Sequence, residues 1–520
     1  MKLCLFIFFY IFCVIGASKQ ENSRKFEKYR NCMRNNGISS WKVVSAVSNA
    51  TSYNMLNYQW NKVFDFVFPI AIFIPSSVYD VQATVVCGYN ADIQLVPNSG
   101  RHSYAGLSLG TNDAIIVDFR YMNSIEINED EEYFTVGPGA LIGHVIAKLW
   151  TNGGWGIALG TCMTVAMGGF VMGGGYSLYS SLYGLAIDNL LEINMVDAQG
   201  NAVTANPTQN TDLWWAMRGV GAGYIGLVTS FKLKMFRARD LKLTIAQRMF
   251  NGEDFPNVMD NYVKWLDWVK QNDETVTTTI SGGRTGVFVR MIHVQDPNKQ
   301  PVSSKAVLAA LPKYFPNATE TDVSYKSFIE TVIGLSEISV TIPEPTSFGA
   351  EEESPETTLE KHLNFYSSLT KDVIYSEYSL DKTFFVDKRI RARDLYDVQE
   401  VFAKIPETCS VSFLPHQGAI AVPQSTDCAY VHRDAIFDCL LTCYGWNFEQ
   451  AYVGEKWMNE FMIVARFMDS GHTYQNYPDK DLNDYLWRYY GRNLKKLIRI
   501  KRKWDPYGYF RSEQSIPIRR

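Results

Sequence analysis

Two nucleophilic side chains, His102 and Cys162, stand in separate glycine-containing loops. His102 belongs to the segment Ser99–Gly106, and Cys162 precedes a run with glycines at positions 168, 169, 173, 174 and 175. Glycine allows positive φ and a close approach of the backbone to a ligand, and freed N–H groups can bind phosphate. The two loops are therefore suited to holding a cofactor. A flexible linker would be rich in Gly and Ser, whereas Val, Met and Phe interrupt the second run.

The sequence lacks the motifs of several other kinds of functional site. No Cys-x-x-Cys pair, His-Glu-x-x-His motif or histidine-rich cluster is present, so we expect no zinc site. A phosphate-binding Gly-x-x-x-x-Gly-Lys-Ser/Thr loop is also absent from the sequence. The 50 Lys and Arg residues against 54 Asp and Glu give a net charge of −4. This weak acidity gives no electrostatic support for binding to nucleic acid, and no protein partner is evident.

The N-terminus predicts export. Lys2 precedes an apolar run over residues 3–15, and small residues follow at 16–18. This pattern is typical of a secretory signal peptide, here residues 1–17, and the run is too short to span a bilayer comfortably. We therefore expect a secreted protein without a membrane anchor, and the sequons at Asn49 and Asn317 are candidate glycosylation sites.

The hydrophobic pattern divides the remaining chain into four parts. Residues 18–68 are predicted to be mixed helix and loop, and residues 69–237 alternate short strands with helices. Residues 238–465 predict one sheet backed by helices, and residues 466–520 return to short polar and aromatic motifs. The expected fold class is α+β.

Four motifs occur in a fixed order along the chain. They are Ser99-Gly100-Arg101-His102-Ser103-Tyr104-Ala105-Gly106, Gly160-Thr161-Cys162 with the glycines that follow, Tyr474-Gln475-Asn476-Tyr477, and Phe510-Arg511-Ser512-Glu513-Gln514-Ser515-Ile516-Pro517. In order and spacing they resemble the berberine bridge enzyme-like flavoprotein oxidases, which share the FAD-binding fold of vanillyl-alcohol oxidase. The resemblance implies a two-part PCMH-type FAD-binding domain (18–68 and 69–237), a substrate-binding domain with an antiparallel sheet (238–465), and a C-terminal segment (466–520) that returns to the FAD domain.

The resemblance also implies a doubly attached FAD. His102 would bond the 8α-methyl carbon of the flavin, and Cys162 would bond carbon 6. Arg101 departs from the family, which usually has glycine there. The alternatives are an ordinary loop histidine and a buried free thiol. Further cofactor contacts are expected from Ser99, Gly100, Arg101, Ser103, Gly106, Thr161, Val165, Gly168, Gly169, Gly173, Val228, Tyr474 and Asn476.

Tyr477 matches the position of the catalytic base in several members of the family. A phenol ordinarily has a pKa of about 10, so it needs a nearby cation or donor to act as a base. Without that help Tyr477 would be an aromatic wall of the substrate site. Cys439 and Leu441 match substrate-binding positions that are more polar in relatives, and Cys439 also has the alternative of a disulfide. Val165 matches the position that controls the access of oxygen, and valine there is associated with oxidases.

The expected function is that of a secreted FAD-dependent oxidase. It would oxidise a small, aromatic alcohol or hydroxynitrile by hydride transfer to the flavin, with O2 reduced to H2O2; the apolar character of Cys439 and Leu441 favours such a substrate. One alternative is a carbohydrate oxidase that acts at the anomeric hydroxyl, and another is a catalytically inactive secreted flavoprotein. A disulfide between Cys32 and Cys87 is expected, whereas the pairing of the cysteines at 409, 428, 439 and 443 stays open.

Overall fold

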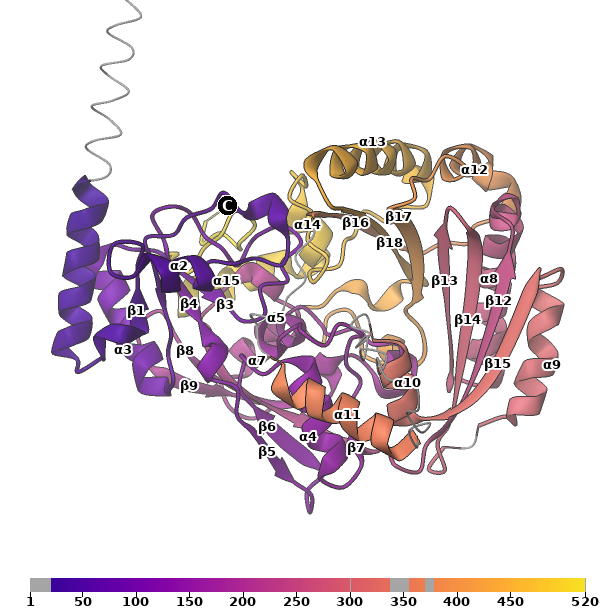
Figure 1. The fold of residues 1–520 in the computed structure, drawn as a ribbon, viewed down its shortest axis with the longest axis horizontal. Helices are drawn as coiled ribbons and strands as arrows, with labels where there is room; N and C mark the ends of the chain where they lie inside the picture. The colour runs from indigo at the N-terminus through magenta and orange to yellow at the C-terminus, as the bar shows by residue number, and fades with distance from the viewer. Residues whose placement is uncertain (1–19, 300, 337–354, 370–377, 520) are drawn as a thin grey trace, which may run out of the picture.

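The computed structural model describes residues 20–299, 301–336, 355–369 and 378–519. The expected signal peptide, residues 1–17, lies outside the described residues. Figure 1 shows two units side by side, with the C-terminal segment returning to the first. Among the described residues, no helix is both long enough and apolar enough to cross a bilayer.

The first unit begins with a four-stranded sheet in the order β1-β2-β4-β3. Strands β2, β4 and β3 run parallel, and β1 pairs antiparallel with β2. Their bounds are β1 Val43–Val44, β2 Ala71–Phe73, β3 Leu95–Asn98 and β4 Ile115–Asp118. Helices α2 (Ala50–Leu56) and α3 (Val78–Ala91) follow β1 and β2, and Ser77 caps α3 by accepting a hydrogen bond from the backbone N–H of Asp80 at 3.2 Å.

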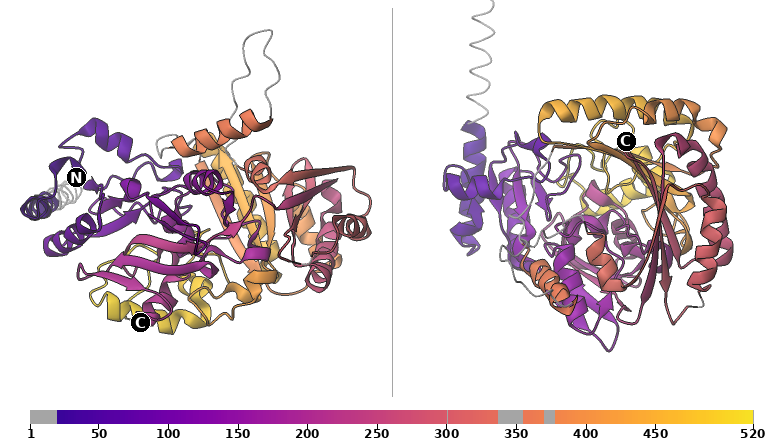
Figure 2. Two further views of the ribbon diagram at one scale, coloured as in Figure 1. Left: turned by 90° about the horizontal axis from the view of Figure 1, so that it is seen from below. Right: turned by 45° about the vertical axis from the view of Figure 1, so that its right-hand side comes forward.

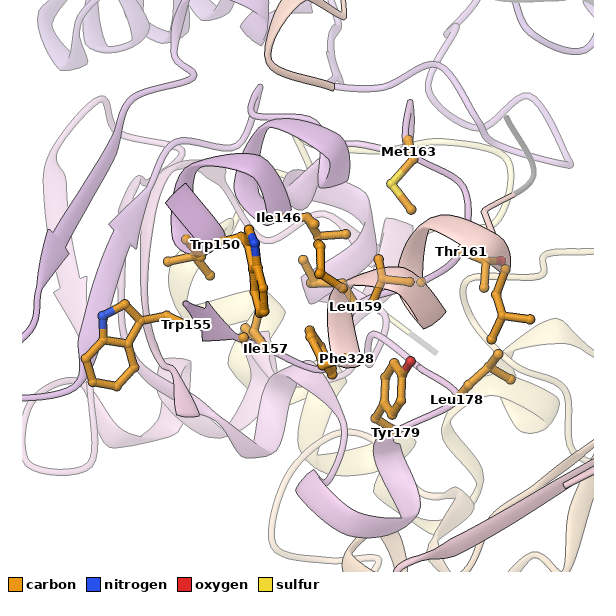
Figure 3. Close-up of a pocket in the computed structure, with 16 residues that line it drawn as sticks. Ile146, Trp150, Trp155, Ile157, Leu159, Thr161, Met163, Leu178, Tyr179 and Phe328 are labelled. Carbon is orange, nitrogen blue, oxygen red and sulfur yellow. The ribbon is translucent and has the colours of Figure 1, made fainter. Parts of the chain in front are cut away.

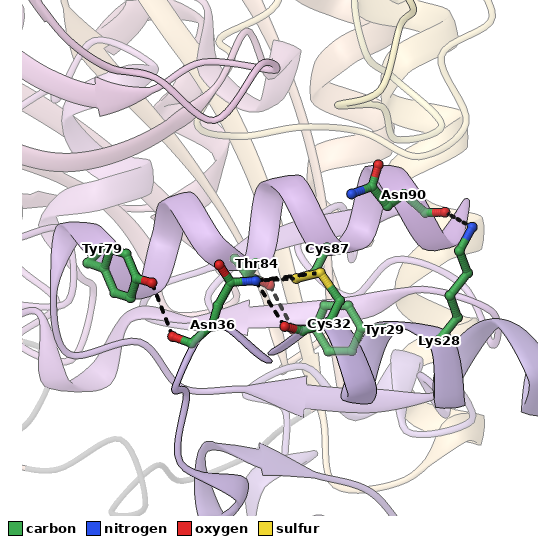
Figure 4. Close-up of a disulfide and its surroundings, with 8 residues drawn as sticks. All are labelled: Lys28, Tyr29, Cys32, Asn36, Tyr79, Thr84, Cys87 and Asn90. Atoms are coloured by element: carbon green, nitrogen blue, oxygen red, sulfur yellow. Dashed lines mark hydrogen bonds between the residues drawn. A yellow bond between two sulfur atoms is a disulfide. The ribbon is translucent and has the colours of Figure 1, made fainter. Parts of the chain in front are cut away.

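A disulfide ties the N-terminal helix, residues 20–35, to this sheet unit. Cys32 bonds Cys87 of α3, with the two Cα atoms 5.5 Å apart, as Figure 4 shows. Beside it the Tyr29 hydroxyl shares a hydrogen bond of 2.7 Å with the hydroxyl of Thr84. The expected Cys32–Cys87 pairing is therefore confirmed.

A five-stranded antiparallel sheet, in the order β5-β6-β10-β8-β9, completes the first unit. Its strands are β5 Ile125–Asn128, β6 Tyr133–Val136, β8 Leu190–Val196, β9 Ala202–Ala205 and β10 Leu227–Lys234; the short pair is β7 Trp155–Gly156 with β11 Phe236–Arg237. Its helices are α4 Ile142–Thr151, α5 Met167–Met172, α6 Ser180–Tyr183 and α7 Thr211–Met217. Their buried faces share one core with the C-terminal segment.

The second unit is built on a seven-stranded antiparallel sheet in the order β15-β12-β14-β13-β17-β18-β16. The strands are β12 Lys242–Phe250, β13 Val276–Gly283, β14 Gly286–Gln295, β15 Glu320–Ser327, β16 Tyr378–Val386, β17 Cys409–Pro415 and β18 Phe437–Gly445. Helices α8 Phe255–Asn272, α9 Ser304–Tyr314, α12 Tyr396–Phe402 and α13 Phe448–Val464 cover its outer face (Figures 1 and 2), while α10 Phe328–Gly334 and α11 Pro355–Ser368 lie between the units.

The C-terminal segment packs on the first unit through α14 (Tyr485–Tyr490) and α15 (Leu494–Trp504). The indole N–H of Trp504 donates to Asp212 of α7 at 3.3 Å. Lys501 is buried on α15, where it pairs with Asp505 at 2.7 Å. The basic residues of α15 otherwise line its exposed side, as the alternation with Leu and Ile predicts.

Candidate active site

An open cleft in the first unit brings together the chemically interesting loops. Its empty space, including the open mouth, is about 1580 Å³. The loop after β3, the loop that carries Cys162, helix α5 and the start of β10 form its length. Tyr444, Tyr474 and Tyr477 also line it. A space of this extent suits a large cofactor together with a substrate.

The two predicted anchors meet at one hydroxyl group. The ring nitrogen Nε2 of His102 forms a hydrogen bond of 2.9 Å with Oγ1 of Thr164, and Sγ of Cys162 lies 3.6 Å from the same oxygen. Burial lowers the pKa of His102 to about 3, so the imidazole is neutral and keeps a lone pair. Cys162 takes part in neither of the two disulfides of the described residues. Both nucleophiles therefore line the cleft in forms that can bond to carbon, and Thr164 holds them close together.

Glycine is required at two positions where the backbone of the cleft wall packs closely against neighbouring atoms. A Cβ on Gly168 would lie 2.3 Å from Oγ of Ser99, and one on Gly100 would lie 2.6 Å from the backbone N of Ala166. By contrast, nothing lies within 4 Å of a Cβ built on Gly169, which is exposed to the cleft. Bare backbone therefore faces open space at Gly169, as close approach of a cofactor requires.

Arg101, the departure from the family, adopts the backbone conformation of a glycine. Its φ is +63°, in the left-handed region. Its guanidinium is buried, donates to Asp118 at 2.7 Å and to the carbonyl of Tyr58 at 2.8 Å, and so points away from solvent. The ion pair holds the loop that carries His102 against the end of β4.

Most of the predicted cofactor residues line the cleft. They are Ser99, Gly100, Arg101, His102, Ser103, Thr161, Cys162, Val165, Gly168, Gly169, Val228, Tyr474 and Asn476. Two do not. Gly106, at φ +66°, packs against the ring of Phe64, and Gly173 packs against Asn476, whose Oδ1 would lie 1.9 Å from an added Cβ. These two glycines are needed for close packing behind the wall.

Several aromatic rings in the lining of the cleft contact one another. Trp60 stacks on His102 with ring centroids 5.2 Å apart, and Tyr104 stacks on Tyr477 at 5.6 Å. Tyr474 lies edge-on to Tyr477 at 5.0 Å. Two of these rings, Trp60 and Tyr104, were not among the predicted site residues, although both lie close to the His102 loop in sequence or space.

Hydrogen bonds fix Tyr474 in this wall. Its hydroxyl accepts from the backbone N–H groups of Gly175 and Tyr176, both at 3.0 Å, and from Nδ2 of Asn476 at 3.1 Å. Asn476 also donates to the carbonyl of Phe170 at 2.8 Å. Burial raises the pKa of Tyr474, which therefore stays protonated. The C-terminal motif is thus bound to the glycine run that follows Cys162.

Cys439 and Leu441 of β18, which were predicted to bind substrate, do not line the cleft. Cys439 and Leu441 are fully buried and lie in the core between the large sheet and its outer helices, with Phe384 and Phe413 as strand neighbours of Cys439. Cys439 is also a free thiol, because the disulfide joins Cys409 and Cys443. Side chains alternate between the faces of a strand, so an error of one residue reverses every assignment.

The opposite face of β18 carries Asp438, Leu440, Thr442 and Tyr444 toward the first unit. Asp438 is buried, accepts a hydrogen bond of 2.5 Å from Thr383, and its Oδ2 has no hydrogen-bond partner among the described residues. Burial raises the pKa of Asp438 to about 7, despite the bond from Thr383. Its charge also raises the pKa of the nearby Tyr176. The alternation of apolar residues at 437, 439, 441 and 443 groups these four on one face of β18, but it does not show which face meets the first unit.

A second, apolar cavity lies behind the loop that carries Cys162. Figure 3 shows Ile146, Trp150, Leu159 and Phe328 around it. Its lining comes from α4, α10 and the segment 155–163, and it carries none of the nucleophilic or acidic side chains described above. It is a packing cavity of the interior rather than the chemical site.

Two family models match the parts of the chain that supply most of the cleft lining. Residues 69–206 match the FAD binding domain family, and residues 473–517 match the berberine and berberine-like family. Berberine bridge enzyme-like 23 of Arabidopsis thaliana is 27% identical, with 99% of this chain and 98% of the relative covered. The chain thus carries the FAD-binding domain and the berberine-like segment, and it is similar over its whole length to berberine bridge enzyme-like proteins.

Two further comparisons support this assignment. Chitooligosaccharide oxidase of Gibberella zeae is 27% identical over 92% of this chain and 91% of its own length. The solved structure of BBE-like 1 from Physcomitrella patens has a TM-score of 0.79 and 24% identity, covering 95% of this chain and 99% of that one, which shows the same fold. The expected family, fold class and enzyme class are thereby confirmed.

The residues of the cleft fit the FAD that this family implies. The FAD-binding match covers the loop with His102, the loop with Cys162 and the exposed backbone of Gly169. The berberine-like match supplies Tyr474 and Tyr477, which also line the cleft. The protein is thus an FAD-dependent oxidoreductase.

Proposed function

We propose that this protein is an oxidase that acts on a hydroxyl group of a carbohydrate, at the anomeric carbon. The observation that carries the proposal is the orientation of β18, which places Cys439 and Leu441 in the outer core and Tyr444, on the opposite face of the strand, in the lining of the cleft. The argument for an apolar substrate rested on Cys439 and Leu441, and both lie in the outer core. A similar protein, the chitooligosaccharide oxidase of Gibberella zeae, carries a sugar substrate in its name.

We propose that His102 and Cys162 hold FAD covalently. The neutral imidazole of His102 and the thiol of Cys162, which share the hydroxyl of Thr164, are two neighbouring nucleophiles in the lining of the cleft. When bound, FAD supplies the two-electron acceptor and the reactivity toward O2. Two attachments would prevent loss of the cofactor in the dilute conditions outside a cell.

Tyr477 is the residue that accepts the proton of the substrate hydroxyl in this proposal. It lies at the end of the cleft, half-buried, where Tyr104 stacks parallel to it and Tyr474 contacts its edge. These contacts fix the ring, so its oxygen keeps one position relative to a bound alcohol. A positioned base contributes about 100- to 10,000-fold to rate. Tyr477→Phe should therefore lower kcat about 100-fold or more while the protein stays folded.

Val165 supports the proposal that O2 is the acceptor. It is half-buried and lines the cleft three residues after Cys162. A small β-branched side chain leaves apolar room next to the cofactor loop. Val165→Leu should slow the reaction with O2 and leave turnover with an artificial electron acceptor intact.

A peroxide assay tests the substrate class. Purified enzyme is supplied with glucose, N-acetylglucosamine and their β-1,4-linked oligomers, and separately with benzylic alcohols and a cyanohydrin. Peroxide from the sugars, lost in Tyr477→Phe, is the expected result. Turnover of aromatic alcohols alone would replace the carbohydrate by the second candidate, which the stacked rings of Tyr104 and Tyr477 favour. No peroxide from any substrate would indicate a protein without catalytic activity.

We infer that the protein works outside the cytosol. Two disulfides, Cys32–Cys87 and Cys409–Cys443, suit an oxidising compartment, and the sequon residues Asn49 and Asn317 are both exposed. Loss of about one glycan mass in each of Asn49→Gln and Asn317→Gln, after expression through a eukaryotic secretory pathway, tests this.

A further inference from the structure

We propose that the basic face of α15 binds an acidic polysaccharide, a polymer whose sugar units carry carboxylate groups. The basic face consists of Lys495, Lys496, Arg499, Arg502 and Lys503, of which all but Lys496 are exposed. It belongs to the C-terminal segment, which Figure 2 shows at the surface of the first unit. None of the five residues lines the cleft, so this surface would hold the enzyme on the polymer without taking part in its reaction.

Positive charge is concentrated around α15 in a protein that is acidic as a whole. The segment 492–503 holds seven Lys and Arg residues and no Asp or Glu, whereas the whole chain has 50 basic and 54 acidic residues. The rest of the chain therefore has 43 basic against 54 acidic residues, a net charge of −11. Such a separation of charge directs a polyanion to one face of the molecule.

Helical spacing brings the five basic side chains to one side of α15. With 3.6 residues in a turn, their positions fall within about a third of the circumference of the helix. The opposite side carries Leu497, Ile498 and Ile500, which are buried. The apolar side therefore fixes the helix on the first unit, and the basic side faces solvent.

The stability of the helix does not account for these charges. Lys495 and Lys496 lie in the first turn, where the helix dipole disfavours positive charge, and no acidic residue accompanies them there. Arg499 follows Lys495 by four residues, and Lys503 follows Arg499 by four, so like charges are neighbours along the helix. Burial and the nearby charge of Arg499 lower the pKa of Lys496. Binding of a negative partner would relieve these repulsions.

The elements packed against α15 neutralise little of its charge. Asp212 of α7 pairs with Lys503 at 2.7 Å. Nε of Arg502 donates to the carbonyl of Ile518 at 2.9 Å, which leaves the charge of the guanidinium uncompensated. Among the residues that the structure describes, Lys495, Arg499 and Arg502 form no ion pair with a carboxylate. These three side chains are therefore available to a partner from outside the chain.

Geometry and location favour a polysaccharide over other polyanions. The apolar side of α15 is buried, so the helix cannot insert it into a bilayer as an amphipathic membrane helix does. The location outside the cytosol that is proposed above disfavours nucleic acid. Positions 495, 499 and 502 recur along about 10 Å of the helix, as contact with successive carboxylates of a linear polymer requires.

Binding of the flavin-loaded protein to immobilised polygalacturonate tests the proposal by biolayer interferometry. The polymer is attached through its reducing ends, so that no anomeric hydroxyl is left to react, and neutral dextran is the uncharged control. Wild type should bind polygalacturonate and not dextran. Raising NaCl from about 50 to about 200 mM should weaken the binding about tenfold or more, because salt screens the charges and opposes the release of counterions.

The triple variant Lys495→Gln, Arg499→Gln and Arg502→Gln should lose about tenfold or more in affinity, with an unchanged flavin spectrum and unchanged urea unfolding. The control replaces Lys270, Lys305 and Lys313 by Gln. These lysines are exposed on α8 and α9 of the second unit, so the control removes the same charge and should bind as wild type. Arg499→Lys with Arg502→Lys keeps the charge and should also bind.

Three outcomes would overturn the proposal. The first is no binding of wild type to polygalacturonate at low salt. The second is an equal loss of affinity in the two triple variants, which would show an effect of net charge alone. The third is tighter binding to vesicles that contain phosphatidylserine, or to duplex DNA, than to polygalacturonate at the same concentration of negative charge.

The peroxide assay separates this inference from the proposed function. The triple variant of the basic face should lose the polymer and keep wild-type turnover of a small soluble substrate. Binding to polygalacturonate by a protein that yields no peroxide would support the basic face and reject the oxidase. Peroxide from a small sugar, with no binding to polygalacturonate, would support the oxidase and reject the basic face.

Discussion

Asp438 should make the protein less stable as the pH rises from about 4 to about 7. In an unfolded chain this carboxyl ionises near its ordinary pKa of 3.8, whereas burial raises its pKa to about 7 in the folded protein. Between these values the unfolded state holds fewer protons than the folded state, so stability falls with rising pH. The loss is complete above pH 7, where both states are ionised.

The size of the effect follows from the shift. About three pKa units at 1.36 kcal/mol each correspond to about 4 kcal/mol. The side chain is only 1% exposed, so solvent does little to screen this effect. Asp438→Asn removes the ionisation and keeps an oxygen that accepts from Thr383. The substitution should therefore change stability by less than about 1 kcal/mol at pH 4 and stabilise the protein by about 4 kcal/mol at pH 8.5.

Urea unfolding of the flavin-loaded protein at pH 4, 5.5, 7 and 8.5 measures this. The difference between Asp438→Asn and wild type is the useful quantity, because contributions from other groups cancel in it. Asp387→Asn is the matched control, since Asp387 lies just beyond β16 and is exposed; its difference should be flat. Parallel stability curves for wild type and Asp438→Asn would refute the reasoning, because they would show that this carboxyl is not buried in its neutral form.

Three further predictions concern the core, the anchors and the N-terminal disulfide. Leu441→Ala should lower the free energy of unfolding by about 2–5 kcal/mol and leave KM unchanged, because the side chain is in the outer core; a raised KM at normal stability would return it to the substrate site. Flavin should stay with the acid-precipitated protein in Cys162→Ala and in His102→Ala but not in the double variant; release from either single variant would contradict two attachments. Replacing Cys32 and Cys87 by serine opens a loop of 55 residues and should lower stability by about 4 kcal/mol in urea, and unchanged unfolding would contradict this.

The placement of His102 and Cys162 in the cleft could be predicted because the signals for it are local. His102 and Cys162 each lie within a few residues of glycines, which indicate that the backbone approaches a ligand closely. Both residues line the cleft. Arg101 occupies a position where the family usually has glycine. Its backbone has a φ of +63°, as a glycine there would allow, and its side chain forms a buried ion pair with Asp118. Local backbone geometry of this kind follows from residue type and spacing.

The orientation of β18 could not be settled in the same way. A period of two shows that residues 437, 439, 441 and 443 share one face, but both faces of this strand are buried, one under helices and one under the first unit. Resemblance at single positions was then the remaining guide to which face meets the substrate. An assignment shifted by one residue placed Cys439 and Leu441 in the substrate site. Burial against α8, α12 and α13 places them elsewhere.

The sequence by itself determined the family, the order of the motifs, the two nucleophiles and the Cys32–Cys87 disulfide. Only the tertiary structure decided which distant residues meet: Thr164 between the anchors, Tyr104 against Tyr477, and Asp438 on the buried inner face. The physical reason is that a motif fixes a backbone over a few residues. A contact between separate elements depends instead on which face of each is covered, and that is settled only when the whole core packs.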